Sequence, residues 1–292
     1  MNPLKGLAIG AFAFCLTISS AEALTPEEEQ QLSDLVNQAT SVSQGAEVAG
    51  ARIVAQDGVM LRGKDACTFS MLLNADEVCD TTAIVFPKDG VGIDSIYYSA
   101  PEDIGHVNMD DWTEDVASQI DDIWDSYVEG SKAQSERIGF DVVPLKWVLY
   151  PSLNKAAKVM TYGILLDFGG SEVINLVSVK FTRKGYVVME IVTDEQMLSA
   201  ANVNYDDISV YASNTYNPAS GWRYADFKEG DKVAAIGAVG VLASVIGVKY
   251  SKGWLAGIGA LIAVFAKKLW VLLLVIPAAI WGGIKKLFGR SE

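Results

Sequence analysis

The side chains best suited to chemistry in this sequence are carboxylates, because the chain has one histidine and three cysteines. His106 stands in Gly105-His106-Val107, with no serine or cysteine nucleophile near it in a recognisable frame. The patterns G-x-S-x-G, H-E-x-x-H, G-x-G-x-x-G and the phosphate-binding P-loop are absent from the sequence. We therefore assign no catalytic, cofactor-binding or metal-binding residue, and we interpret His106 as a structural or surface side chain.

One predicted helix, from about Asp111 to Arg137, carries carboxylates opposite an apolar stripe. The stripe residues recur every three or four positions: Trp112, Val116, Ile120, Ile123, Trp124, Tyr127 and Val128. The other face carries Glu114, Asp121, Asp125 and Glu129. Like charges four residues apart repel slightly, so we consider two interpretations: an interaction face for a basic partner or a divalent cation, or a solvated face that keeps the protein soluble. A further pair, Asp206 and Asp207, has no hydrolase spacing.

The elements that position these residues predict an α+β fold: an antiparallel sheet with one long amphipathic helix, followed by a C-terminal membrane-helix region. Thr25 and Pro26 begin an N-terminal helix, and residues 44–50 are a predicted linker. Strands are expected at Ala51–Ala55, Val59–Arg62, Ala83–Phe86, Ile93–Tyr98, Val142–Tyr150, Lys158–Asp167, Val173–Arg183 and Tyr186–Val192. The turns joining the last four are too short for crossovers, so these strands should be antiparallel neighbours. Two short helices are expected at residues 194–201 and 205–212.

The first 23 residues have the pattern of a secretory signal peptide. Lys5 supplies the positive charge, Gly6–Ile18 is an uncharged apolar run, and Ala21-Glu22-Ala23 is a small-x-small cleavage site. The mature chain should then begin at Leu24. An uncleaved N-terminal anchor is the alternative, although the run is short for a membrane span.

Cys67 and Cys79 are the two cysteines that remain after cleavage of the signal, which contains Cys15. Export places them in an oxidising compartment, so we predict a disulfide between them. Closing a loop of this size stabilises a fold by roughly 3 kcal/mol in the chain-entropy model. Two free buried thiols are the alternative.

Charge is divided unevenly along the chain. Residues 24–232 hold 34 Asp and Glu against 15 Lys and Arg, a net charge of −19. Residues 233–292 hold seven Lys and Arg and one acid, a net charge of +6. An acidic domain would be repelled by phosphate, so nucleic acid is excluded as a partner, whereas a cationic apolar tail suits anionic lipid headgroups.

The tail, residues 233–292, contains three apolar stretches separated by lysines: Val233–Val248, Gly253–Ala266 and Leu269–Ile284. The third is the strongest candidate for a bilayer span, because its sixteen residues reach about 24 Å and flanking lysines can extend toward the headgroups. Tryptophans near both ends suit the two interfaces. The predicted membrane-anchor residues are Lys267, Lys268, Trp270, Trp281, Lys285 and Lys286.

The number of membrane crossings depends on where the basic C-terminal end lies. If the domain is outside and the basic end is cytoplasmic, the tail crosses once or three times. Two crossings would leave both ends outside, and a tail lying entirely in the interface would not cross. Gly253 and Gly257 form a G-x-x-x-G pattern that allows close helix packing, so the tail is also a candidate for homo-oligomer formation.

The segment from Gly221 to Gly237, GWRYADFKEGDKVAAIG, resembles the junction in a family of uncharacterised bacterial membrane-anchored proteins, a domain of unknown function. Gly105-His106-Val107 before Asp110-Asp111-Trp112, and Lys146-Trp147 before Tyr150-Pro151, fit the same family over roughly residues 83–290. The resemblance implies an export signal, an extracytoplasmic domain and a hydrophobic C-terminal tail. It brings no established activity, cofactor or catalytic residue, and the two cysteines are not part of the family pattern.

Two functional hypotheses follow from these observations. The first is a non-enzymatic binding or scaffold module of the bacterial inner membrane, with its domain in the periplasm or outside and with the lipid bilayer and another envelope protein as partners. The second is a carboxylate-dependent enzyme acting on a cell-wall or lipid substrate. A pocket that holds two carboxylates, at least one with a shifted pKa, would favour the second hypothesis.

Overall fold

A computed structural model describes residues 25–43, 45–48, 50–55, 57–74, 79–88, 90–138, 141–168 and 170–247. The chain divides into two compact units, residues 1–248 and 249–292, and only the first contains described residues. The predicted signal peptide, residues 1–23, lies outside the described residues. So do the anchor residues Lys267, Lys268, Trp270, Trp281, Lys285 and Lys286. The signal, the anchor and the localisation therefore stay predictions.

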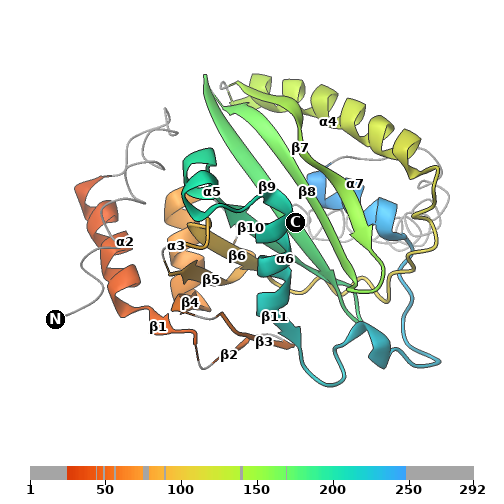
Figure 1. The fold of residues 1–292 in the computed structure, drawn as a ribbon, viewed down its shortest axis with the longest axis horizontal. Helices are drawn as coiled ribbons and strands as arrows, with labels where there is room; N and C mark the ends of the chain where they lie inside the picture. Colours follow the sequence, from red (N-terminus) through yellow and green to blue (C-terminus); the bar gives the residue numbers. More distant parts are fainter. Residues whose placement is uncertain are drawn as a thin grey trace, which may run out of the picture. The chain divides into compact units, whose positions relative to one another are not determined.

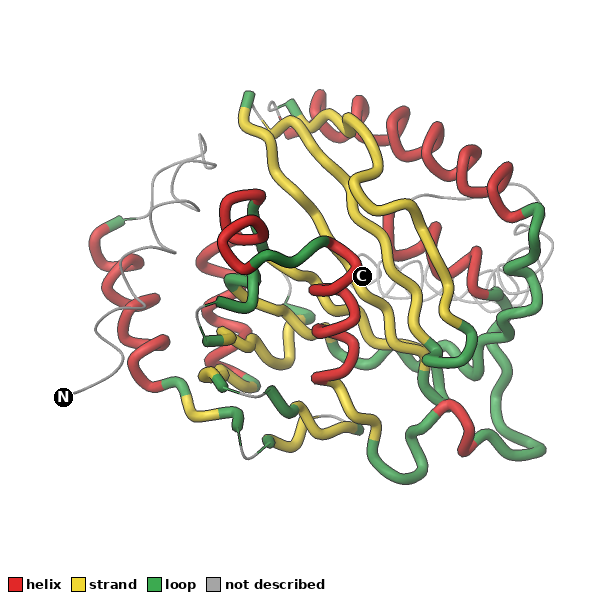
Figure 2. The backbone as a smooth tube through the Cα atoms, viewed as in Figure 1, coloured by secondary structure: helices red, strands yellow, loops and turns green. Residues whose placement is uncertain are grey.

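The centre of the fold is an eight-stranded sheet in which all neighbouring strands are antiparallel. Its spatial order is β1 (Thr40–Ser41), β4 (Gly58–Arg62), β5 (Thr81–Pro87), β6 (Ser95–Ser99), β10 (Tyr186–Val192), β9 (Ser171–Phe181), β8 (Val159–Phe168) and β7 (Val142–Asn154). A second, three-stranded sheet has the order β11 (Tyr216–Pro218), β3 (Ala51–Ile53) and β2 (Ala46–Val48). The long strands β7, β8 and β9 form one twisted layer (Figure 2). The predicted α+β class with an antiparallel sheet is confirmed.

Helices cover both faces of the large sheet (Figure 1). They are α2 (Pro26–Gln38), α3 (Lys64–Asn74), α4 (Val116–Ile138), α5 (Glu195–Ala201), α6 (Tyr205–Thr215), the 3₁₀ turn η2 (Tyr224–Asp226) and α7 (Ala238–Ile246). Successive strand residues point to opposite faces. In β5, for example, Ala83 and Val85 join a core with α5, α6 and the small sheet, whereas Ile84 joins a second core with α2 and α3. Both halves of the chain therefore share one sheet.

In the N-terminal third, local sequence signals predicted some of the secondary structure and missed the rest. Thr25 caps α2 and Pro26 opens the helix, as predicted, and Glu28 completes a capping box with Thr25. The linker prediction for residues 44–50 was wrong in part, because Ala46–Val48 forms β2 and pairs with β3. Helix α3 was not predicted. This short helix packs Ala66 and Phe69 against the sheet. Tertiary packing therefore stabilises a helix that the periodicity of the sequence did not indicate.

The predicted long helix begins five residues later than the sequence indicated. Residues 109–116 form successive turns, with Trp112 N–H donating to the Met109 carbonyl, and α4 starts at Val116. Asp111 does not cap this helix, because its carboxylate binds the first amides of α7. Along α4, Trp124 packs against Trp147 of the edge strand β7, with ring centroids 4.8 Å apart. The apolar stripe thus faces the sheet.

Within residues 25–247, outside the gaps given above, no helix is both long and apolar enough to span a bilayer. The first apolar stretch of the tail begins inside the first compact unit, where nine of its residues form α7. Residues Ala238 to Ala243 of this helix are all buried.

Candidate functional site at the turn end of the sheet

Two hairpin turns lie at the same end of the large sheet, since β7 and β9 run in one direction and β8 and β10 in the other. The first turn spans residues 155–158 and the second spans residues 182–185. The Phe181 N–H donates to the Lys158 carbonyl at 2.9 Å, which joins the two turns. We call this region the turn end.

A segment of irregular chain, which we call the strap (residues 219–237), crosses the turn end. It contains the Gly221–Gly237 sequence singled out above. The Ala219 N–H donates to the Gly50 carbonyl, and the Arg183 N–H donates to the Trp222 carbonyl at 2.9 Å. An isolated antiparallel bridge joins Thr182 to Arg223. The strap is therefore bonded both to the small-sheet side and to the β9–β10 turn before it enters α7.

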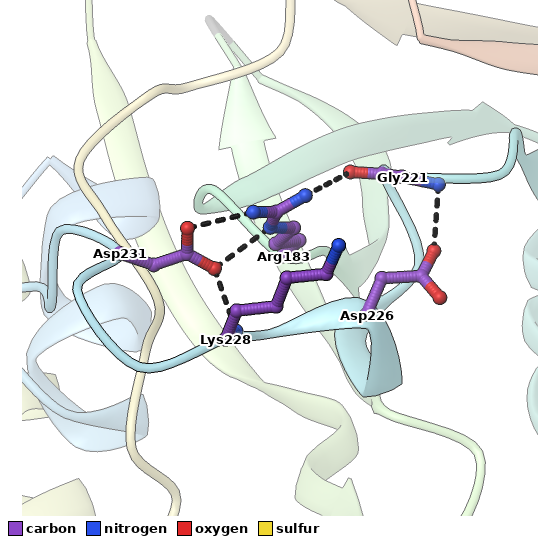
Figure 3. Close-up of polar contacts among 5 residues, drawn as sticks. All are labelled: Arg183, Gly221, Asp226, Lys228 and Asp231. Atoms are coloured by element: carbon purple, nitrogen blue, oxygen red, sulfur yellow. Dashed lines mark hydrogen bonds and ion pairs between the residues drawn. The ribbon is translucent and has the colours of Figure 1, made fainter.

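Arg183 and Asp231 form the central ion pair of the strap. The guanidinium donates from Nε and Nη2 to the two carboxylate oxygens at 2.7 Å each, and the side chains are about one-fifth exposed. Asp231 also accepts from the Lys228 N–H at 2.7 Å (Figure 3). These bonds from Arg183 and Lys228 lower the pKa of Asp231 to about 2. Arg183 reaches the Gly221 carbonyl as well, so one side chain fixes both ends of the strap.

The strap also pairs with the loop that contains His106. The His106 N–H donates to the Lys232 carbonyl at 2.8 Å, and the Ala234 N–H donates to the His106 carbonyl at 2.9 Å. Gly105 precedes this bridge with φ +102°, and a Cβ there would lie 2.8 Å from the Ala234 nitrogen. Only glycine allows the two segments to approach so closely without strain.

The His106 ring lies between two aromatic rings of the strap, Tyr224 and Phe227, at centroid distances of 4.0 and 4.1 Å. Burial lowers the pKa of His106, although a hydrogen bond to the Arg183 carbonyl opposes that shift. Its Nδ1 is buried without a hydrogen-bond partner. The Tyr224 hydroxyl donates to the Val107 carbonyl at 2.6 Å. The histidine therefore packs the loop against the strap through ring contacts with Tyr224 and Phe227.

Asp111 attaches the start of α7 to the domain. Its carboxylate oxygens accept from the N–H groups of Ala238 at 2.9 Å and Val239 at 3.1 Å. Burial raises the pKa of this carboxyl, although the two amide bonds act in the opposite direction. Gly237 leaves room for the carboxylate, which a Cβ at that position would overlap. A side chain 127 residues away thus caps the helix.

Basic side chains gather at the turn end. Of the fifteen Lys and Arg between residues 24 and 232, seven lie in the two turns and the strap: Lys155, Lys158, Arg183, Lys184, Arg223, Lys228 and Lys232. Apart from Arg183, none of them takes part in an ion pair between described residues. Lys184 Nζ lies 4.9 Å from the ring centroid of Trp222, and Lys158 Nζ lies 4.9 Å from that of Tyr224. Apolar groups are exposed beside them, with Phe227 at 38% and Val233 at 59%.

The predicted acidic face is assembled only in part. Asp121, Asp125 and Glu129 lie four residues apart on α4 and are exposed, whereas Glu114 is exposed in the turn that precedes the helix. Burial, followed by the charge of Asp121, raises the pKa of Tyr150 on β7, so the acidic row borders the edge strand. Among the described residues, no group of three or more His, Cys, Asp or Glu could hold a metal ion. Binding of a basic partner stays a prediction.

The two cysteines lie where a disulfide can form. Cys67 is in α3 and Cys79 precedes β5, with Cα atoms 5.5 Å apart and Sγ atoms within bonding distance. A Cα separation of this size is typical of disulfides. The structure therefore supports a disulfide-capable pair that joins α3 to the strand against which it packs.

The carboxylates with raised pKa values have structural partners. Burial and then the charge of Asp194 raise the pKa of Asp94, which accepts a hydrogen bond from the Ser95 hydroxyl at 3.0 Å. Asp194 itself caps α5 by accepting from the Met197 N–H. A pocket of about 480 Å³ runs along α2, and neither of these carboxylates lines it. Asp206 and Asp207 lie in the first turn of α6, where Asp207 completes a capping box with Asn204.

Sequence reasoning did not find the Arg183–Asp231 pair or the role of Asp111. The strap sequence was recognised as a junction, but nothing in it shows that its partners are a β-turn and a loop far away in the chain. The one available signal was the concentration of Gly, Asp and aromatic residues between Gly221 and Gly237, which is typical of ordered irregular structure.

Fold and site together define an α+β protein with a strapped junction before its C-terminal apolar region and with no recognisable catalytic constellation in the described residues. The chain belongs to the family described as protein of unknown function (DUF2167), whose model matches residues 42–278. The resemblance noted from the sequence is thereby confirmed at the level of an uncharacterised domain family. No curated protein and no solved structure matches the chain.

Proposed function

We propose that this protein is a membrane-anchored module of the bacterial cell envelope that binds another envelope component and has no enzymatic activity. The observation that carries the proposal is the junction itself. An acidic domain of net charge −19 passes, through a strap with specific long-range bonds, into a cationic apolar tail. A rigid junction at that place would hold the domain in a defined position relative to a bilayer.

The start of the tail supports a single crossing by Leu269–Ile284. Helix α7 is nine residues long, about 14 Å, whereas a bilayer core is about 30 Å thick. Its first amides bind Asp111 of the domain. If the first stretch belongs to the domain, three crossings are excluded, and a basic end in the cytoplasm then requires one.

Membrane fractionation with carbonate extraction tests the anchor, and reporter fusions test its orientation. We expect the full chain to stay in the carbonate-insoluble fraction, with a fusion after residue 247 active outside and a fusion after residue 292 active in the cytoplasm. Extraction into the soluble fraction would reject the anchor. If both fusions are active outside, the tail crosses the membrane twice and not once.

Crosslinking in intact cells tests the binding role. The acidic face of α4 offers Asp121, Asp125 and Glu129 for a basic partner. We expect a discrete crosslinked species that is lost when all three are replaced by Asn or Gln, and retained when the exposed Glu172 and Asp206 are replaced in the same way. If both variants keep the species, the α4 face is not the binding surface. If no species forms, the binding role fails.

A further inference from the structure

We propose that the turn end of the sheet docks on anionic phospholipid headgroups, so that the domain lies against the bilayer that holds its tail. This inference rests on the proposed function, because the tail must first bring the domain to the membrane. It goes further by assigning a lipid-contacting surface to the folded domain itself.

The charge at the turn end is the first observation. Six cations there, namely Lys155, Lys158, Lys184, Arg223, Lys228 and Lys232, have no carboxylate partner in an ion pair between described residues. The carboxylates in the same region divide into two groups. Asp226 and Asp231 accept bonds from the strap and from Arg183, whereas Glu102, Asp103, Asp110 and Glu229 are exposed. With Arg183 and Asp111 included, seven cations face seven carboxylates, so the turn end is close to neutral, whereas the rest of the domain carries its net charge of −19.

This asymmetry orients the domain. Anionic lipid attracts basic groups within about one Debye length of the surface and repels carboxylates. The acidic row on α4 and the excess acid elsewhere would turn away from such a surface, while the turn end would face it. The same distribution explains why an acidic protein can approach an acidic bilayer in one orientation.

The apolar side chains are the second observation. Phe227 and Val233 are 38% and 59% exposed within the basic strap, and Trp222 is partly exposed beneath Lys184. Aromatic rings next to lysines are typical of the headgroup region, where the ring enters the interface and the amine stays in water. Exposed apolar groups with lysines beside them suit a lipid surface better than a soluble anion.

The reach of the chain is the third observation. The strap ends at Gly237, α7 adds about 14 Å, and six further residues lead to the second apolar stretch at Gly253. Six extended residues span at most about 20 Å, so a second stretch in the bilayer or its interface keeps the strap within a few tens of ångströms of lipid. If Leu269–Ile284 alone is embedded, the 22 residues between α7 and Leu269 extend to at most about 75 Å. Tethering of this kind gives a high effective concentration, so weak electrostatic contacts suffice.

Lysine acylation of the full chain tests the proposal. The protein is reconstituted in nanodiscs of phosphatidylcholine alone, or of phosphatidylcholine and phosphatidylglycerol in equal amounts, and labelled with an uncharged acetylating reagent. Mass spectrometry reports the rate at each lysine. We expect the rates at Lys184, Lys228 and Lys232 to fall at least threefold in the anionic discs at low salt, and this difference to disappear in high salt. Exposed Lys132 in α4 and exposed Lys146 near the start of β7 lie toward the opposite end of the sheet and should be unaffected.

A matched pair of charge variants makes the test specific. Lys184→Glu with Lys228→Glu should restore the labelling rate of Lys232 to its value in neutral discs, whereas Lys132→Glu with Lys146→Glu changes the net charge equally and should leave Lys232 protected. Equal labelling in both lipids, or equal protection of Lys132 and Lys146, would overturn the inference. Failure of the chain to enter the discs would be a failure of the anchor, which the lipid-to-protein ratio of the purified particles shows separately.

Discussion

Two regions of this molecule fasten a segment of chain to the sheet, and they do so by different means. The Cys67–Cys79 pair joins α3 to β5 across twelve residues. The strap is fastened by polar contacts between distant positions, with Arg183 and Asp231 separated by 48 residues and Asp111 and Ala238 by 127. A disulfide between the two cysteines would respond to redox conditions, whereas the polar long-range links respond to pH and to single substitutions. We therefore expect the α3 region to loosen under reducing conditions and the strap to loosen at low pH.

The largest effect should come from breaking the cysteine link. The double variant Cys67→Ser, Cys79→Ser, in detergent-solubilised full chain, should lose about 3 kcal/mol of unfolding free energy if the disulfide is formed. Dithiothreitol should lower the Tm of the wild type by a similar amount and leave the variant unchanged. A wild-type Tm that does not respond to reduction would mean that the two thiols are free.

The strap should be the next most sensitive, at the glycine where it meets the His106 loop. Gly105→Ala combines a left-handed φ with a Cβ 2.8 Å from the Ala234 nitrogen, so we expect a loss of about 2–3 kcal/mol. Gly230→Ala is the matched control, because φ is +92° and no atom lies within 4 Å of its added Cβ. Its cost should be only that of the backbone, about 1 kcal/mol.

Hydrogen exchange distinguishes the two glycine variants. Faster exchange at the Ala234 amide is expected only for Gly105→Ala, since that amide donates to the His106 carbonyl. If both variants lose the same stability and the same protection, contact between the loop and the strap contributes nothing beyond the glycine conformation.

The same two regions show how far the sequence could be interpreted. The Thr25 cap of α2 lies beside the residues that it caps, and hairpin turns join strands that are neighbours in sequence, so local patterns predicted both. The Cys67–Cys79 proximity also followed from a short separation and two available cysteines. Asp111 was assigned to the helix that follows it, because no local pattern indicates that its partners are Ala238 and Val239.

The candidate site was the least predictable part for the same reason. The carboxylate row on α4 was visible because it repeats every four residues, although Glu114 lies outside the helix. The basic cluster at the turn end was invisible, since its members come from two turns and the strap, and only the sheet register brings them together. In the sequence these lysines are scattered through an acidic domain.

A smaller effect is expected at the cap of α7. Asp111→Ala removes the side-chain acceptor of the Ala238 and Val239 amides, although the Ala238 N–H keeps the Asn108 carbonyl, and should cost about 1 kcal/mol, as for other helix caps. Exchange at Val239 should accelerate while the Arg183–Asp231 part of the strap stays protected. Asp110→Ala is the neighbouring control, because the Ala238 and Val239 amides donate to Asp111 and not to Asp110, and it should change stability by less than about 0.5 kcal/mol. If the two variants have equal effects, Asp111 does not act as the cap of α7.

The smallest effect at neutral pH, and the one that best separates the two regions, is the acid response of the strap. Bonds from Arg183 lower the pKa of Asp231 to about 2 in the folded protein, against an unfolded value near 3.9. A lowered carboxyl pKa gives a stabilisation that is complete above the unfolded value and is lost as the pH falls through the folded one. Protection of the Lys228 amide, corrected for intrinsic exchange, should therefore be constant from pH 7 to about 4 and then decrease toward pH 2. In Asp231→Asn it should be lower throughout and no longer decrease in that interval, whereas α3 beside the cysteine pair should behave alike in both proteins. A decrease that begins above pH 5, or one that persists in Asp231→Asn, would show that another group controls the strap.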